Sequence, residues 1–233
     1  IHRPPKKLCK GGRAAQDEQT PVAEPELLAY LESRVCTMDV ENDWRLGAVL
    51  AALVGAYGGA RHAHMCRSQL VSKGRLFIKA AVYRGKKNDA GVRPGFVFHF
   101  PCQGITGVEY GEVLWKRWHE ACKLQGGVVY SISLDITTGL NMPLNVFNNV
   151  LTEVAEPIIR RSELHKQLKV TSYWFRGVGA TLADIRRAPW YERSPLGDWA
   201  AKNAKASDNA DNLMPQRYAR SKAALDCQHY RRL

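Results

Sequence analysis

The sequence lacks the patterns that mark several classes of protein. Its six cysteines include no C-x-x-C pair, which argues against a disulfide framework or a zinc site and favours reduced intracellular thiols. The longest apolar stretch, residues 46–57, is shorter than the roughly 20 residues that a membrane-spanning helix needs. No secretory signal pattern and no internal repeat are visible, so we expect a partial or processed intracellular chain.

Acidic residues are in the minority. The 34 Lys and Arg outnumber the 22 Asp and Glu, which gives a formal net charge of +12. Such an excess favours polyanionic partners, with nucleic acid as the first expectation and an anionic membrane surface as the second. The 233 residues fit one main domain, since a domain commonly holds roughly 100 to 200 residues.

One short segment brings metal-ligand residue types together. His62, His64 and Cys66 lie within five residues of one another. No second cluster with matching spacing completes a tetrahedral shell. We therefore expect no metal and no other cofactor.

The first half of the chain divides into an arm, two helices and a hairpin. Residues 1–22 are basic and broken by Pro and Gly, as in a linker, and folding is expected to begin near Pro25 with a short helix over 26–31. Asp43 is predicted to be the N-cap of a longer helix that ends at Gly58 and Gly59. The side chains predicted to be buried by this helix are Trp44, Leu46, Val49, Leu50 and Leu53.

Alternating apolar residues over 75–83 and 95–100 predict two strands joined by a turn-rich loop that carries lysines. Amphipathic patterns then predict further helices around 113–118, 146–159, 172–185 and 194–202, and from residue 214 onward. The predicted fold class is mainly α with a small antiparallel β-sheet (α+β).

Three blocks in the C-terminal part carry residue types suited to phosphodiester chemistry. They are residues 173–181 with Arg176, residues 195–199 with Trp199, and residues 214–219 with Tyr218. A phosphate in transit needs fixed positive charge on its non-bridging oxygens, and a tyrosine hydroxyl can act as the nucleophile that holds it covalently.

With residues 53–64 added, the ordered set resembles the catalytic domain of the tyrosine recombinase (phage integrase) family. The family's first box, a core helix running into glycine and arginine, is matched up to Arg61, with His64 where the family usually has an acid. Its hairpin lysine is matched by Lys86, with Lys87 as the neighbouring alternative. Its second box is matched by residues 173–181, with Tyr173 in place of the family's histidine.

The last two matches lie farther along the chain. Trp199, with Asp198 as its rival, stands where the family has histidine or tryptophan. Tyr218 matches the nucleophile, although its distance from Trp199 is about twice the usual one. Tyr230 is a fallback and Tyr191 precedes Trp199, out of order.

The resemblance implies metal-independent cleavage and rejoining of double-stranded DNA through a 3′-phosphotyrosyl intermediate, for integration or excision of a mobile element. It implies that Arg61 and Arg176 hold the phosphate, Lys86 protonates the leaving oxygen, and Trp199 and Tyr173 donate hydrogen bonds. Residues 23–233 would be the catalytic domain, without the family's N-terminal core-binding domain. The protein would act inside the cell as a homo-multimer on DNA.

Two other readings stay open. In one, the chain is a degenerate relative that binds DNA without cutting it; in the other, the motif matches are coincidental in a helical RNA-binding or scaffold module. Trp174 and Phe175 are expected to be core aromatics, and His64 is expected to be buried rather than a catalytic base.

Overall fold

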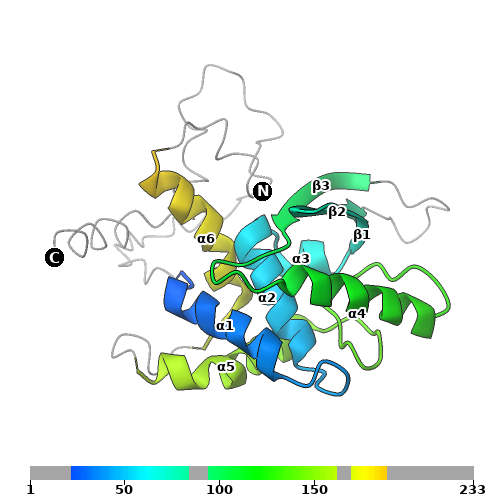
Figure 1. The fold of residues 1–233 in the computed structure, drawn as a ribbon, viewed down its shortest axis with the longest axis horizontal. Helices are drawn as coiled ribbons and strands as arrows, with labels where there is room; N and C mark the ends of the chain where they lie inside the picture. Colours follow the sequence, from blue (N-terminus) through cyan, green and yellow to red (C-terminus); the bar gives the residue numbers. More distant parts are fainter. Residues whose placement is uncertain (1–21, 84–93, 162–168, 188–233) are drawn as a thin grey trace, which may run out of the picture.

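The structure, a computed structural model, describes residues 22–83, 94–161 and 169–187 (Figure 1). The helices are α1 (Pro25–Thr37), α2 (Leu46–Gly58), α3 (His62–Met65), α4 (Tyr110–Leu124), α5 (Leu144–Ile159) and α6 (Ser172–Ile185). The strands are β1 (Ser68–Lys73), β2 (Phe77–Tyr83) and β3 (Pro94–Pro101). The predicted α+β class, mainly helical with one small antiparallel sheet, is confirmed.

Helix α2 forms the centre of the core. Every residue from Leu46 to Ala56 is buried, as expected for a helix that is apolar on all sides. Helices α1, α4, α5 and α6 and strand β3 all pack against it (Figure 1). Gly59 ends the helix with φ 63°, a left-handed conformation that glycine adopts without steric cost, so the predicted glycine stop is confirmed.

The predicted start of this helix was wrong by two residues. Asp43 lies before the helix, where its carboxylate accepts hydrogen bonds from the Arg45 backbone and forms an ion pair with the Arg45 guanidinium at 2.9 Å. Arg45 is the N-cap residue. Because Trp44 belongs to the preceding turn and not to the helix, it is 38 % exposed rather than buried.

The sheet has the strand order β1-β2-β3 with both pairings antiparallel. Ile78, Ala80 and Val82 of β2 face the core, and Phe98 and Phe100 of β3 lie beside them. The predicted hairpin of β2 and β3 is confirmed. Strand β1 was not predicted; it pairs with β2 through an irregular register between Leu70 and Ser72.

Helix α1 begins at Pro25, as expected, but extends well beyond the predicted residue 31. Its extension contains Glu32, which is completely buried and accepts hydrogen bonds from the backbone N–H groups of Ile105 and Thr106, each at 2.9 Å. The hydroxyls of Tyr57 and Thr106 also donate to this carboxylate. Glu32 thereby ties the loop after β3 to both α1 and α2.

The helices predicted around 113–118, 146–159 and 172–185 are present as α4, α5 and α6. The arm predicted for residues 1–22, apart from Val22, and the helices predicted over 194–202 and from 214 lie outside the described residues. In the described ranges, the structure contains no helix that is both long and apolar enough to span a bilayer.

Candidate functional site

Arg61 is held at a sharp turn between α2 and α3. After Gly59 the chain becomes extended at Arg61, with φ −74° and ψ 149°, and then enters α3. The Arg61 carbonyl accepts hydrogen bonds from the backbone of His64 at 2.8 Å and Met65 at 3.0 Å. These hydrogen bonds fix the backbone at Arg61, and its side chain is exposed to solvent.

His62, the next residue, points the other way, into the protein. It is 8 % exposed, its Nε2 lies 3.1 Å from Ser133 Oγ, and its ring lies 4.7 Å from that of Phe147. Burial lowers the pKa of His62, and a hydrogen bond to the Met142 backbone opposes this shift only in part. His62 is therefore a neutral anchor that fixes the Arg61 turn to the loop before α5.

Cys66 lies beside this histidine without forming a nucleophilic pair with it. Its Sγ is 3.5 Å from His62 Nδ1, but burial raises the pKa of the Cys66 thiol to about 11. A thiol with that pKa stays protonated near neutral pH and is a poor nucleophile. Among the described residues, no group of three or more His, Cys, Asp or Glu side chains is arranged to hold a metal ion.

The second predicted box forms the first turns of α6. Trp174 and Phe175 are 3 % and 1 % exposed, as expected for core aromatics. Arg176 is also buried, at 2 % exposure, whereas Tyr173 is 54 % exposed. The two polar residues predicted to act together thus have opposite environments on one helix.

Helix α6 packs along α2, which places the two predicted boxes on neighbouring elements (Figure 1). Gly55 lies at this contact: a Cβ placed there would lie 3.5 Å from the Cβ of Phe175, an ordinary van der Waals distance. Arg61 follows the end of α2, and Arg176 follows Phe175. The fold therefore packs the helix that leads toward Arg61 against the helix that contains Arg176, although the two arginines are more than 100 residues apart in the sequence.

The remaining predicted site residues are not among the described ones. Lys86, Trp199 and Tyr218 fall outside the described ranges. The same holds for the alternatives that the sequence left open, which are Lys87, Tyr191, Asp198 and Tyr230. Their roles stay predictions.

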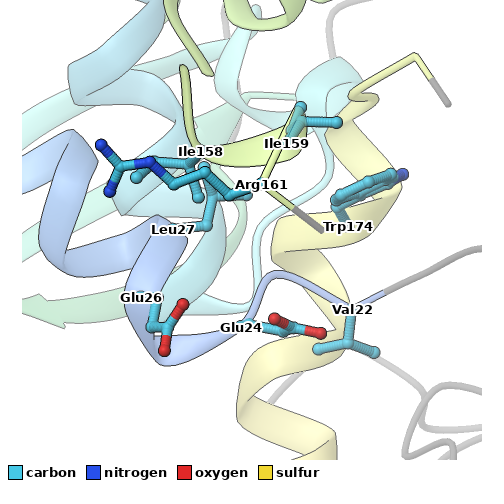
Figure 2. A pocket seen from close by; sticks show the side chains of 8 residues that line it. All are labelled: Val22, Glu24, Glu26, Leu27, Ile158, Ile159, Arg161 and Trp174. Atoms are coloured by element: carbon cyan, nitrogen blue, oxygen red, sulfur yellow. The ribbon is translucent and has the colours of Figure 1, made fainter. Parts of the chain in front are cut away.

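Two hollows in the described surface are lined by other residues. One of about 260 Å³ lies between the start of α1, the end of α5 and Trp174, with the carboxylates of Glu24 and Glu26 opposite Arg161 (Figure 2). The other, of about 470 Å³, is lined by Asp39, Asn42, Asp43, Trp44, Arg45 and Glu153. Carboxylates outnumber cations in both linings, so neither hollow is suited to a phosphate.

Sequence reasoning did not identify Ser133 as part of the Arg61 support. Its hydroxyl meets His62 across 71 residues of sequence, in a segment without regular structure except for an isolated bridge between Leu134 and Asn141. No periodicity or short motif signals such a contact.

Comparison with known proteins is informative at the level of the fold. No protein-family model matches the sequence, and no curated protein is significantly similar to it. Among solved structures, the chain is similar to the crystal structure of XerA recombinase, a tyrosine recombinase, with a TM-score of 0.55 and 15 % sequence identity. The match covers 97 % of this chain and 67 % of that one. The chain thus shares the overall fold of a tyrosine recombinase.

Proposed function

We propose that this protein cleaves and rejoins DNA strands through a 3′-phosphotyrosyl intermediate. The observation that supports the proposal is the packing of α2 against α6 within a recombinase-like fold, since α2 leads toward Arg61 and α6 contains Arg176. The formal net charge of +12 supports duplex DNA as the partner.

The two arginines are proposed to hold the scissile phosphate. A guanidinium matches the geometry of two phosphate oxygens and stays charged at every relevant pH. Arg61 is exposed and is the group that meets the duplex first. Arg176 is buried. Because solvent screens a buried charge less than an exposed one, Arg176 would attract a phosphate that reaches it more strongly than a surface arginine does.

Tyr218 is proposed to supply the nucleophile. Its hydroxyl gives up its proton to water as the oxygen bonds to phosphorus, the bond to the 5′ oxygen breaks, and Lys86 donates the proton that this leaving oxygen takes up. The products are a 3′-phosphotyrosyl ester and a free 5′-hydroxyl. Attack by the 5′-hydroxyl of another strand reverses the step and releases the tyrosine.

Trp199 and Tyr173 are proposed as hydrogen-bond donors to the same phosphate. The wider role that follows is integration or excision of a mobile element, carried out inside the cell by several copies of the chain on DNA. We further propose that basic residues along the chain, among them Lys169, Arg186 and Arg187, contact the duplex backbone.

A second candidate function is DNA binding without cleavage. The burial of Arg176 favours it, because an arginine that is 2 % exposed has to become accessible before it can hold a phosphate of a duplex. This candidate predicts salt-sensitive duplex binding and no covalent product.

The test is covalent capture on DNA. The full chain is incubated with a nicked pool of genomic fragments, so that cleavage releases a short strand and traps the adduct, which is then detected after denaturation. We expect an adduct with the wild type and with Tyr230→Phe, and none with Tyr218→Phe. An adduct that persists in Tyr218→Phe contradicts the assignment, and binding without any adduct supports the second candidate.

A further inference from the structure

The face of the sheet that is turned away from the core carries two exposed apolar side chains, Phe77 and Val97, beside the partly exposed Lys79, whereas Ala81 on the same face is buried. Antiparallel partners point to the same side, so Phe77 lies beside Pro101, Lys79 beside His99, and Ala81 beside Val97. We call these six residues the outer sheet face. Phe77 is 54 % exposed and Val97 is 42 % exposed.

The other face of the sheet is the one that packs on helices. Helix α2 contacts β3 and helix α4 contacts β1 (Figure 1). Lys73 of β1 lies on this helix-covered face. It is the register partner of the inward-facing Ile78 and forms an ion pair with Glu112 of α4. Phe77 and Val97 on the opposite side are too exposed to belong to the core, so their apolar surface is available to a ligand.

The part of the sequence that contains the sheet is rich in cations. Residues 44–108 contain ten Lys and Arg but a single acid, Asp89, and the three strands contain no acid at all. Lys79 lies on the face itself, and the exposed Arg75 lies in the turn that leads into β2. An exposed aromatic ring amid cations, without carboxylates between them, complements a polyanion that carries flat apolar groups.

Single-stranded nucleic acid has that chemistry. Its bases have free faces that can stack on aromatic side chains. In a duplex the bases are already stacked on one another, so the aromatic side chains of a sheet cannot stack on them. Tyr83 extends the aromatic character along β2, since its ring meets Tyr130 edge to face at 5.3 Å and Tyr130 is 45 % exposed. Phe77 and Tyr83 are six residues apart, about 20 Å along an extended strand.

We propose that the outer sheet face binds single-stranded nucleic acid, with a base stacked on Phe77 and the neighbouring phosphates held by Lys79 and Arg75. This site does not include Arg61, Tyr173 or Arg176, so it does not depend on the strand-cleavage function proposed above. A second copy of the chain is a less favourable occupant, because the same cations would then face each other across the contact.

The test compares a fluorescently labelled oligo-dT with a duplex of the same length, titrated with the full chain. We expect Phe77→Ala to weaken oligo-dT binding by about fivefold or more, the effect of one lost base stack, and to leave duplex binding unchanged. Phe77→Trp restores the wild-type affinity because it restores the stacking surface.

Lys79→Ala tests the charge contribution. We expect the slope of log K against log salt for oligo-dT to become shallower by about 0.7, which corresponds to one phosphate contact on a single strand. The matched controls are Leu140→Ala and Lys123→Ala, which alter an exposed aliphatic side chain and an exposed cation far from the sheet in sequence. Both should bind oligo-dT like the wild type.

Three outcomes overturn the proposal: no binding of oligo-dT by the wild type, wild-type binding by Phe77→Ala, or an equal loss of oligo-dT and duplex binding in that variant. If Phe77→Ala instead lowers the mass measured by light scattering and leaves oligo-dT binding intact, the face is a contact between copies. Because Phe77 is exposed, thermal unfolding of the variant should match that of the wild type, which separates loss of binding from loss of fold.

Discussion

The Nε2 atom of His62 lies 3.1 Å from the hydroxyl oxygen of Ser133, and this contact fixes the turn that presents Arg61. Ser133 is completely buried and His62 nearly so. The contact joins the end of the first predicted box to the loop in front of α5. The exposed arginine therefore depends on a neutral, buried histidine beside it.

The stability of the protein should fall as the solution becomes acidic, in part because of His62. Burial lowers its pKa in the folded state, so its contribution is fully present above the unfolded histidine value of about 6.5 and is lost as the pH falls below it. His62→Gln should give a shallower dependence of Tm on pH between 7 and 5. The exposed His119→Gln is the control, and a slope unchanged in His62→Gln contradicts the assignment.

A second prediction concerns the buried carboxylate of Glu32. Glu32→Gln replaces an acceptor of four hydrogen bonds with an amide that turns a donor toward some of the same groups. We expect a loss of about 1.5–3 kcal/mol in the free energy of unfolding, measured by urea denaturation. Glu26→Gln, on the exposed side of the same helix, should be nearly neutral, and equal effects of the two changes contradict the role of Glu32.

Where local patterns agree with burial, the sequence predicts this fold well. Leu46, Val49, Leu50 and Leu53 are all completely buried at helical spacing, and the hairpin of β2 and β3 follows its alternating residues. The burial of Glu32, by contrast, is not predictable from local sequence patterns. The predicted helix stopped at residue 31, one residue before Glu32, whereas the structure continues the helix and buries this carboxylate against partners more than 70 residues away.

In the candidate site, too, local sequence predicted some features and tertiary packing decided the others. The order of the boxes predicted two arginine-bearing segments, and the structure packs α2, which precedes the first, against α6, which contains the second. The burial of Arg176 beside an exposed Tyr173 was not predictable, because both residues satisfy the motif and only tertiary packing distinguishes their environments. Strand β1 was missed for a related reason: its residues are mostly polar, and its pairing with β2 defines it.

Two helical glycines should respond to alanine in opposite directions. A Cβ at Gly47 would lie 1.8 Å from the carbonyl oxygen of Leu134, so Gly47→Ala must displace backbone in the core and should cost about 3 kcal/mol. A Cβ at Gly179 in α6 meets nothing within 4 Å, so Gly179→Ala should stabilise the protein by about 0.5–1 kcal/mol. Urea denaturation measures both, and a neutral Gly47→Ala is incompatible with the packing of α2 on this loop.

The last prediction separates Arg61 from a neighbouring arginine of the same kind. Arg61 and Arg67 are both exposed and lie on either side of α3, but only Arg61 belongs to the proposed phosphate site. Removing one group that stabilises the transition-state charge costs about 10²–10³ in rate. Arg61→Ala should therefore slow formation of the covalent DNA adduct by that factor, while Arg67→Ala should change it little. Duplex binding is measured for both variants, and adduct formation is followed at saturating DNA, so that a loss of affinity is not mistaken for a loss of catalysis. Equal rates of adduct formation in the two variants would remove Arg61 from the site and leave it as one more surface charge.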